Sequence, residues 1–167
     1  ASWEKIAWYE NDGIGQFDSH QAITREADGA VSVYAGDLDG DGDLDVLSSS
    51  SSRNSYEGKI TWYENDGAGQ FGPQQVITIE NDGATAVNVA DLDGDGDQDI
   101  LAAFETEDKV AWYENTDGAG TFGPQQVITT MADRAWSVYA DDLDGDGDLD
   151  VLSASVFDNK IAWYENT

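Results

Sequence analysis

Three copies of one acidic loop, Asp-x-Asp-Gly-Asp-Gly-Asp-x-Asp, carry the most distinctive chemistry of this sequence. They span residues 37–45, 91–99 and 142–150. Carboxylates crowded this closely repel one another, and a hard cation relieves that repulsion. Calcium takes six to eight oxygen ligands in a flexible shell, whereas magnesium demands a more rigid octahedron. We therefore predict that the chain binds Ca²⁺ at three sites.

The spacing within each loop indicates which groups can bind the ion. Side chains at loop positions 1, 3, 5 and 9 can converge, and the backbone carbonyl at position 7 adds a further oxygen. An EF-hand would need a glutamate at position 12, where Ser48, Ala102 and Ser153 stand, so that interpretation fails. A merely solvated acidic turn is the remaining alternative. The predicted metal residues are Asp37, Asp39, Asp41, Asp43, Asp45, Asp91, Asp93, Asp95, Asp97, Asp99, Asp142, Asp144, Asp146, Asp148 and Asp150.

Composition limits the classes of partner. The 167 residues are 40% hydrophobic and 11% aromatic, which suits one packed domain. A net charge of −28 repels nucleic acids and anionic membranes, so we expect no nucleic-acid partner and no membrane insertion. Cysteine is absent, which excludes disulfides and thiolate metal sites. Calcium loops of modest affinity suit surroundings with millimolar calcium, so we predict an extracellular or secreted protein.

The chain is built from internal repeats within a single domain, residues 1–167. A Lys-φ-x-Trp-Tyr-Glu-Asn segment opens each repeat and is followed by an Asp-Gly-x-Gly-x-Phe turn, an Ile-Thr run and the acidic loop. The repeats span 5–58, 59–108 and 109–159, with a partial copy at 160–167. β-branched and aromatic runs between Gly/Asp turns predict four short antiparallel strands per repeat. Units of this length predict an all-β fold, a β-propeller with about three blades per chain.

The segments Phe71-Gly72-Pro73 and Phe122-Gly123-Pro124, together with the acidic loops, resemble the FG-GAP/VCBS repeat family. That family also builds the integrin α-chain propeller and fungal lectins of the Psathyrella velutina type. The first repeat departs from the motif, because Phe17 is followed by Asp18. In the family, the calcium loop joins the first and second strands of a blade. The resemblance therefore implies blades at about 28–78, 82–129 and 133–167, the last completed by residues 5–24.

Three blades are too few to close a ring alone. Two interpretations stay open at this point. Either two chains exchange terminal strands and form a homodimer with a six-bladed ring, or the sequence is a fragment of a longer array. Open strand edges favour association in both cases.

Positions that stay the same in every repeat are best interpreted as scaffold. The repeated tryptophans are expected to pack between blades, and the phenylalanine of each Asp-Gly-x-Gly-x-Phe turn is expected in the core. Loops that vary between repeats lie on the opposite side of the blades from the calcium loops, and binding is often found in such loops. The predicted ligand-contact residues are Trp136, Arg134, Tyr56, Phe104 and Phe157.

Catalysis has little support, because the chain has one histidine, His20, no cysteine and no recognisable catalytic motif. We predict a non-enzymatic, calcium-binding module that binds carbohydrate in the manner of a lectin. A protein-interaction or adhesion module, or a purely structural repeat segment, is the alternative. A solvent-facing tryptophan with a nearby Asn or Asp in each blade would favour glycans. A single patch around Trp136 would favour a protein partner.

Overall fold

A computed structural model describes residues 5–27, 29–51, 58–80 and 83–167, and these residues form strands and turns with no helix. No helix in this part of the chain could therefore span a membrane. The strands form four antiparallel sheets. This confirms the predicted all-β fold with antiparallel, four-stranded units.

Each sheet is formed by strands that follow one another in sequence. The N-terminal hairpin consists of β1 (Ile6–Trp8) and β2 (Gln21–Thr24). The first blade consists of β3 (Ala30–Gly36), β4 (Asp45–Ser50), β5 (Gly58–Tyr63) and β6 (Gln75–Glu80). The second blade consists of β7 (Ala84–Ala90), β8 (Asp99–Phe104), β9 (Lys109–Tyr113) and β10 (Gln126–Thr129). The third blade consists of β11 (Ala135–Asp141), β12 (Asp150–Ser155) and β13 (Lys160–Tyr164).

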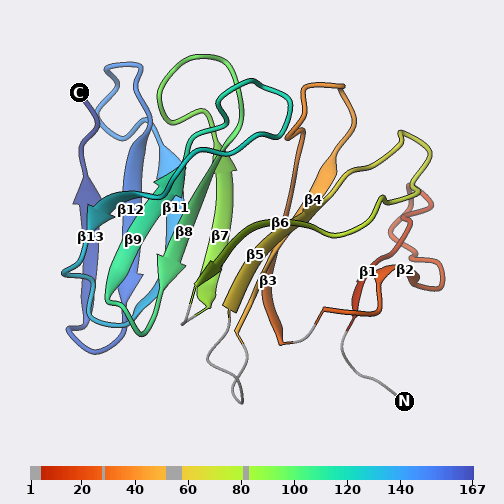
Figure 1. The fold of residues 1–167 in the computed structure, drawn as a ribbon, viewed down its shortest axis with the longest axis horizontal. Coiled ribbons are helices and arrows are strands. Elements are labelled where there is room, and N and C mark those ends of the chain that lie inside the picture. The colour runs from red at the N-terminus through yellow and green to blue at the C-terminus, as the bar shows by residue number, and fades with distance from the viewer. Residues whose placement is uncertain (1–4, 28, 52–57, 81–82) are drawn as a thin grey trace.

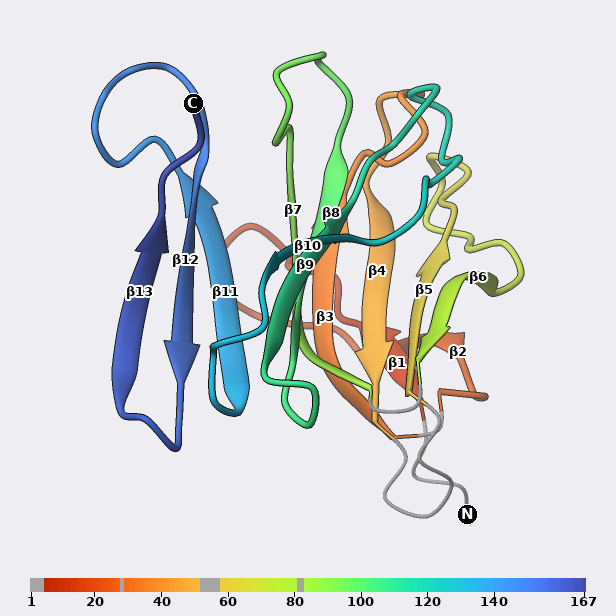
Figure 2. The ribbon, with the colours of Figure 1, turned by 60° about the vertical axis from the view of Figure 1, so that its left-hand side comes forward.

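The sheets stand side by side, and their first strands are neighbours, with β7 in contact with both β3 and β11 (Figures 1 and 2). The row does not close into a ring, and the N-terminal hairpin and the third blade lie at opposite ends of it (Figure 1). The N-terminal hairpin packs beside the first blade and does not pair with the third blade of the same chain. Residues 5–24 therefore leave the third blade with three strands.

The hydrophobic core lies between the blades. Leu47, Ile60 and Trp62 of the first blade pack against Val87 and Val89 of the second. A second cluster joins Leu101 and Val110 of the second blade to Val138 and Val151 of the third. In the second blade, strand alternation places Val87 and Val89 on one face and Leu101 and Val110 on the other, so this internal blade buries both of its faces.

Two of the four repeated tryptophans, Trp8 and Trp62, pack against the glycine turn of the next blade, whereas Trp163 is 50% exposed and lacks the expected packing between blades. A Cβ added to Gly120 would lie 2.6 Å from Cζ2 of Trp62, and one added to Gly69 would lie 3.0 Å from Cζ2 of Trp8. Trp62 is consequently only 4% exposed. The contact explains why glycine stands opposite these two tryptophan rings, because a side chain would occupy the same space.

The phenylalanines of the Asp-Gly-x-Gly-x-Phe turns differ from the expectation in one case. Phe71 and Phe122 are partly buried against the core clusters. Phe17, in contrast, is 65% exposed. Its turn belongs to the N-terminal hairpin, which has two strands in the described part of the chain, so there is no complete blade for it to pack against.

We predict that Gly120→Ala destabilises the fold more than Gly15→Ala. These glycines occupy equivalent turn positions with φ of 81° and 86°, so alanine incurs the same left-handed strain of about 1–2 kcal/mol at both. Only Gly120 faces a tryptophan, and nothing lies within 4 Å of a Cβ at Gly15. Overpacking should therefore lower the free energy of unfolding of Gly120→Ala by a further ~1–3 kcal/mol in urea titrations. Equal losses in the two variants would contradict the tryptophan contact.

Candidate metal centres

The acidic loops join the first and second strands of the three blades and lie at the same end of the sheets, uppermost in Figure 1. In the first loop, the carboxylate of Asp37 accepts hydrogen bonds from the amides of Gly40 (2.8 Å) and Gly42 (3.1 Å). The second and third loops repeat these bonds from Asp91 and Asp142. Gly42, Gly96 and Gly147 adopt φ of 95–104°, which allows the loop to turn back on itself. The sequence repeat therefore produces one loop geometry three times.

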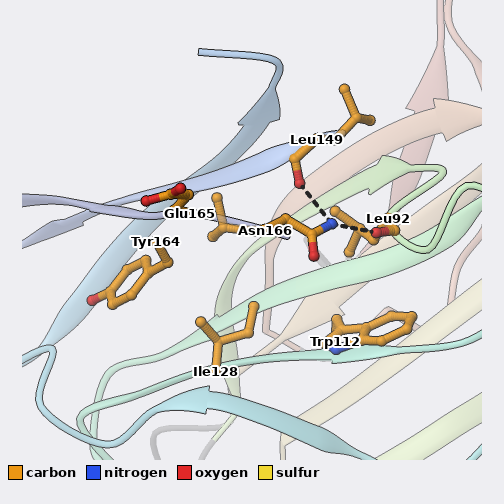
Figure 3. A pocket seen from close by; sticks show the side chains of 8 residues that line it. Leu92, Trp112, Ile128, Leu149, Tyr164, Glu165 and Asn166 are labelled. Atoms are coloured by element: carbon orange, nitrogen blue, oxygen red, sulfur yellow. Dashed lines mark hydrogen bonds between the residues drawn. The ribbon is translucent and has the colours of Figure 1, made fainter. Parts of the chain in front are cut away.

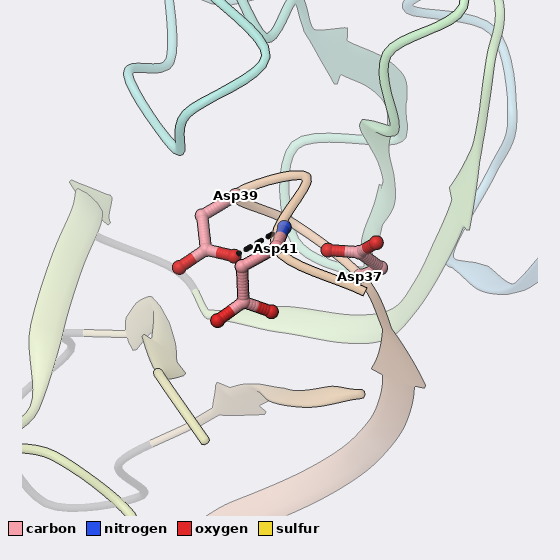
Figure 4. Close-up of side chains that lie close together, drawn as sticks. All are labelled: Asp37, Asp39 and Asp41. Carbon is pink, nitrogen blue, oxygen red and sulfur yellow. Dashed lines mark hydrogen bonds between the residues drawn. The ribbon is translucent and has the colours of Figure 1, made fainter. Parts of the chain in front are cut away.

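Carboxylates from each loop converge at a point where an ion would fit. Figure 4 shows Asp37, Asp39 and Asp41 grouped on the first loop. One oxygen from each lies within 4.8 Å of the others, and the same holds for Asp91, Asp93 and Asp99 and for Asp142, Asp144 and Asp146. Three carboxylate oxygens this close form a candidate site for a cation. The described residues thus form three acidic clusters that could hold metal ions.

The aspartate at loop position 9 is fully buried and links the loop to the third strand of its blade. Asp45 accepts one hydrogen bond from the amide of Leu38 (3.0 Å) and another from that of Asn65 (2.8 Å). Asp99 and Asp150 make the equivalent pairs of bonds. Burial raises the pKa of Asp45 and of Asp99 to about 6, although these amide bonds oppose the shift.

The aspartate at position 7 has a different role from its neighbours. The carboxylates of Asp43 and Asp97 lie against Gly67 and Gly118, in the turn between the third and fourth strands of the same blade. These side chains therefore face that turn. This arrangement leaves the backbone of position 7 as the predicted contribution of Asp43 and Asp97 to the ion.

No protein cation neutralises the acidic loops among the described residues. The ion pairs found there are Lys109–Glu107, Arg134–Glu105 and Lys160–Asp158. All belong to the opposite end of the blades, where β8 turns into β9 and β12 into β13. The charge of each loop consequently has no internal counterion in this part of the chain.

One residue of the site, the asparagine of the Trp-Tyr-Glu-Asn motif, was missed by sequence reasoning. Nδ2 of Asn115 donates to the carbonyl of Leu38 in the preceding blade (2.9 Å), and Nδ2 of Asn166 donates to that of Leu92 (2.8 Å). Each amide therefore ties the third strand of one blade to the acidic loop of the blade before it. Strict repetition of the asparagine was the available signal, but repetition alone does not identify the partner.

The predicted ligand-contact residues divide into three groups. Arg134 and Phe157 meet, with the guanidinium carbon 4.0 Å from the ring centroid, and Trp136 lies two residues further along and is 56% exposed. Phe104 is fully buried in the core, which removes it from the contact surface. Tyr56 falls outside the described residues. Glu105, which pairs with Arg134 at 3.0 Å, joins the group although the sequence did not point to it.

A small cavity of about 130 Å³ lies between the second and third blades near the metal end. Figure 3 shows Trp112 and Ile128 on one side of it, with Tyr164, Glu165 and Asn166 on the other. In the interface between the first two blades, the turn that carries Gly120 covers the equivalent tryptophan, Trp62. The cavity therefore combines an aromatic side chain with an amide and a carboxylate at one interface.

Two four-stranded sheets and one three-stranded sheet, all antiparallel and aligned by their first strands, define a β-propeller-type repeat module. Comparison with protein-family models agrees. The FG-GAP-like repeat model matches residues 1–48, 50–102 and 91–153, so the chain belongs to the FG-GAP-like repeat family. A search of curated proteins found no match to the chain.

We predict opposite pH dependences for the metal-free and metal-loaded protein. Because the folded pKa of Asp45 and Asp99 (about 6) exceeds the unfolded value (3.8), the folded state binds more protons between these values. Their contribution to stability is present below about pH 4 and is lost as the pH rises through 6. The melting temperature of resin-stripped protein should therefore rise from pH 7 to pH 5. With saturating calcium it should fall, because protons compete with the ion. A metal-free melting temperature that falls over this range would contradict the pKa assignment.

Proposed function

We propose that this chain is a calcium-binding β-propeller module in which each ion stabilises the turn between the first and second strands of a blade. The observation that carries the proposal is the convergence of three carboxylates in every loop, with no neutralising cation among the residues that the structure describes. Only oxygen donors are present, which suits a hard cation, and the open loops suit the flexible coordination of calcium better than that of magnesium. Ions bound there would also reduce the repulsion caused by a net charge of −28.

The proposed module works outside the cell, where calcium is abundant enough to fill loops of modest affinity. It acts by binding and not by catalysis. Its proposed binding surface is the distal patch, defined as Arg134, Phe157 and Trp136 with the exposed neighbours Met131 and Val156. This patch lies at the end of the blades opposite the metal loops, so it can contact a partner while the ions hold the fold.

Backbone geometry supports the distal patch. Arg134 has a φ of 54°, a conformation that favours glycine, and Gly29 occupies the equivalent position before β3 with a φ of 66°. A non-glycine residue in this region costs free energy, and such strain concentrates at functional sites. Arginine and tryptophan also dominate the binding energy of protein interfaces. The preferred ligand of the distal patch is therefore another protein, as in an adhesion module.

Carbohydrate binding is the second candidate, and the cavity beside Trp112 favours it. An aromatic face with Glu165 and Asn166 close by offers stacking for a sugar ring and hydrogen bonds for its hydroxyls. The hypothesis that every blade binds a glycan through its repeated tryptophan is weaker, because Trp62 is buried under the next blade and is not available to a glycan. A glycan would thus bind at one interface and not in every blade.

We expect isothermal titration to find three calcium ions per chain. Asp93→Asn should reduce this number to two, because it removes a converging carboxylate while an amide oxygen can still accept the hydrogen bond from Asp95. Asp66→Asn is the matched control: this aspartate accepts hydrogen bonds from the amides of Ala68 and Gln70 in the turn between β5 and β6, and it belongs to no acidic cluster. Calcium at one hundred times its Kd should stabilise the fold by about 2.7 kcal/mol per site. An unchanged melting temperature in calcium would refute the stabilising role.

We predict that Trp136→Thr abolishes capture of an extracellular protein while leaving calcium binding intact. Thr85 occupies the equivalent position in the second blade, so threonine is compatible with the backbone at this position of a blade. A glycan array probed with the calcium-loaded wild type, Trp136→Thr and Trp112→Ala distinguishes the two candidates. Binding to a narrow set of sugars that is kept in Trp136→Thr but lost in Trp112→Ala would show that the cavity beside Trp112, and not the distal patch, is the binding site.

A further inference from the structure

The same seven residues, Lys-Ile-Ala-Trp-Tyr-Glu-Asn, stand at 5–11 and at 160–166. The first copy contains β1 and the second contains β13. In the two complete blades, the equivalent strands β5 and β9 occupy the third position and pair on both sides. Among the described residues, β1 pairs only with β2 and β13 pairs only with β12. β1 therefore has an open edge where a second strand would pair, and β13, with the same sequence, has an open edge where a fourth strand would pair.

The outer faces of the first and third blades are also partly uncovered: the N-terminal hairpin covers Val46 and Tyr63 of the first blade but leaves most of β3 exposed. Val33 on β3 is 58% exposed, whereas the equivalent Val87 on β7 is 5% exposed and Val138 on β11 is 7% exposed. At the other end, Ile161 on β13 is 80% exposed, whereas the equivalent Ile60 and Val110 are fully buried. Each terminal face thus leaves in solvent the positions that the internal blades bury.

These two faces are complementary by the chain's own internal packing. The face of the first blade that carries Ile60 packs on the face of the second that carries Val87. The face of the second that carries Val110 packs in the same way on the face of the third that carries Val138. The exposed face of the third blade carries Ile161, the equivalent of Ile60 and Val110. The exposed face of the first blade carries Val33, the equivalent of Val87 and Val138. In a second copy, each exposed face would therefore find the kind of face against which its equivalents already pack within one chain.

We propose that two copies of this chain associate head to tail and close a six-bladed ring. In each composite blade, β11, β12 and β13 of one copy are joined by β2 of the other, and β13 takes the place of the identical β1. β13 is the better occupant because it already pairs with β12 over five residues and so brings the first three strands of a blade, whereas β1 pairs with β2 alone among the described residues. The copied register aligns Ile161 with Thr24 and Ala162 with Ala22.

The number of copies follows from the number of blades. Each copy contributes two complete blades, which gives four. Each copy also contributes a three-stranded blade that β2 of the other copy completes, which gives two composite blades. Propellers close with about four to eight blades, and six is the one multiple of three within that range. Head-to-tail contacts give a closed ring when the rotation per blade sums to a full turn and would otherwise give filaments. The inference concerns assembly and does not depend on the ligand proposed above.

Sedimentation equilibrium in calcium should give twice the mass of one chain. Val33→Asp and Ile161→Asp each place a charge on one terminal face that is exposed within a single copy, so each variant alone should be monomeric. An equimolar mixture should recover a dimer, because one intact pair of faces remains. Val127→Asp, on an exposed position of β10 away from the terminal faces, should stay dimeric. A monomeric wild type, or a Val33→Asp variant that still dimerises, would overturn the proposal.

Cross-linking tests the register without disturbing the fold. The chain has no cysteine, so Ala22→Cys and Ala162→Cys introduce single thiols on small side chains. An oxidised mixture of the two variants should give a covalent dimer on a non-reducing gel, and neither variant alone should do so. Failure of the mixture to cross-link, or efficient cross-linking by either variant alone, would show a different contact and overturn the composite blade.

Discussion

A buried carboxylate at the end of each acidic loop is the constraint on which the blades depend. Asp45, Asp99 and Asp150 are fully buried, and each accepts amide hydrogen bonds from the second residue of its own loop and from the asparagine after the third strand. A buried carboxylate is costly unless such bonds satisfy it. Each blade therefore holds its first, second and third strands together at this single group.

The same positions also connect one blade with the next. Leu38 donates its amide to Asp45, accepts a bond at its carbonyl from Asn115, and buries its side chain completely in the core between the first two blades. Leu92 has the equivalent bonds to Asp99 and Asn166. A repeat protein gains stability from such contacts between neighbours, since one repeat cannot bury its hydrophobic face alone. The acidic loop is thus part of the contact between blades as well as a candidate metal site.

The fold was predictable because the repeats reveal it several times over. Acidic loops, Gly/Asp turns and β-branched runs recur in a fixed order. A strand or turn predicted in one repeat can therefore be checked against the same positions of the other repeats. Differences within the candidate site were less predictable. Phe104 and Phe157 come from equivalent hairpins, yet one is buried and the other is 59% exposed. A pattern that assigns both to a loop cannot tell which of them points into the core, because that depends on the sheet packed beside it.

Coupling between the loops and the blade contacts suggests how a bound ion would act at a distance. If calcium occupies the first loop, it neutralises carboxylates that lie within a few residues of Leu38, the residue that holds Asn115 of the next blade. Unrelieved repulsion would instead strain the loop where it carries that contact. The ion would therefore stabilise the relation between two blades, and not only a surface turn. Leu92 holds Asn166 in the same way, so ions in the first two loops would each act on a contact between blades.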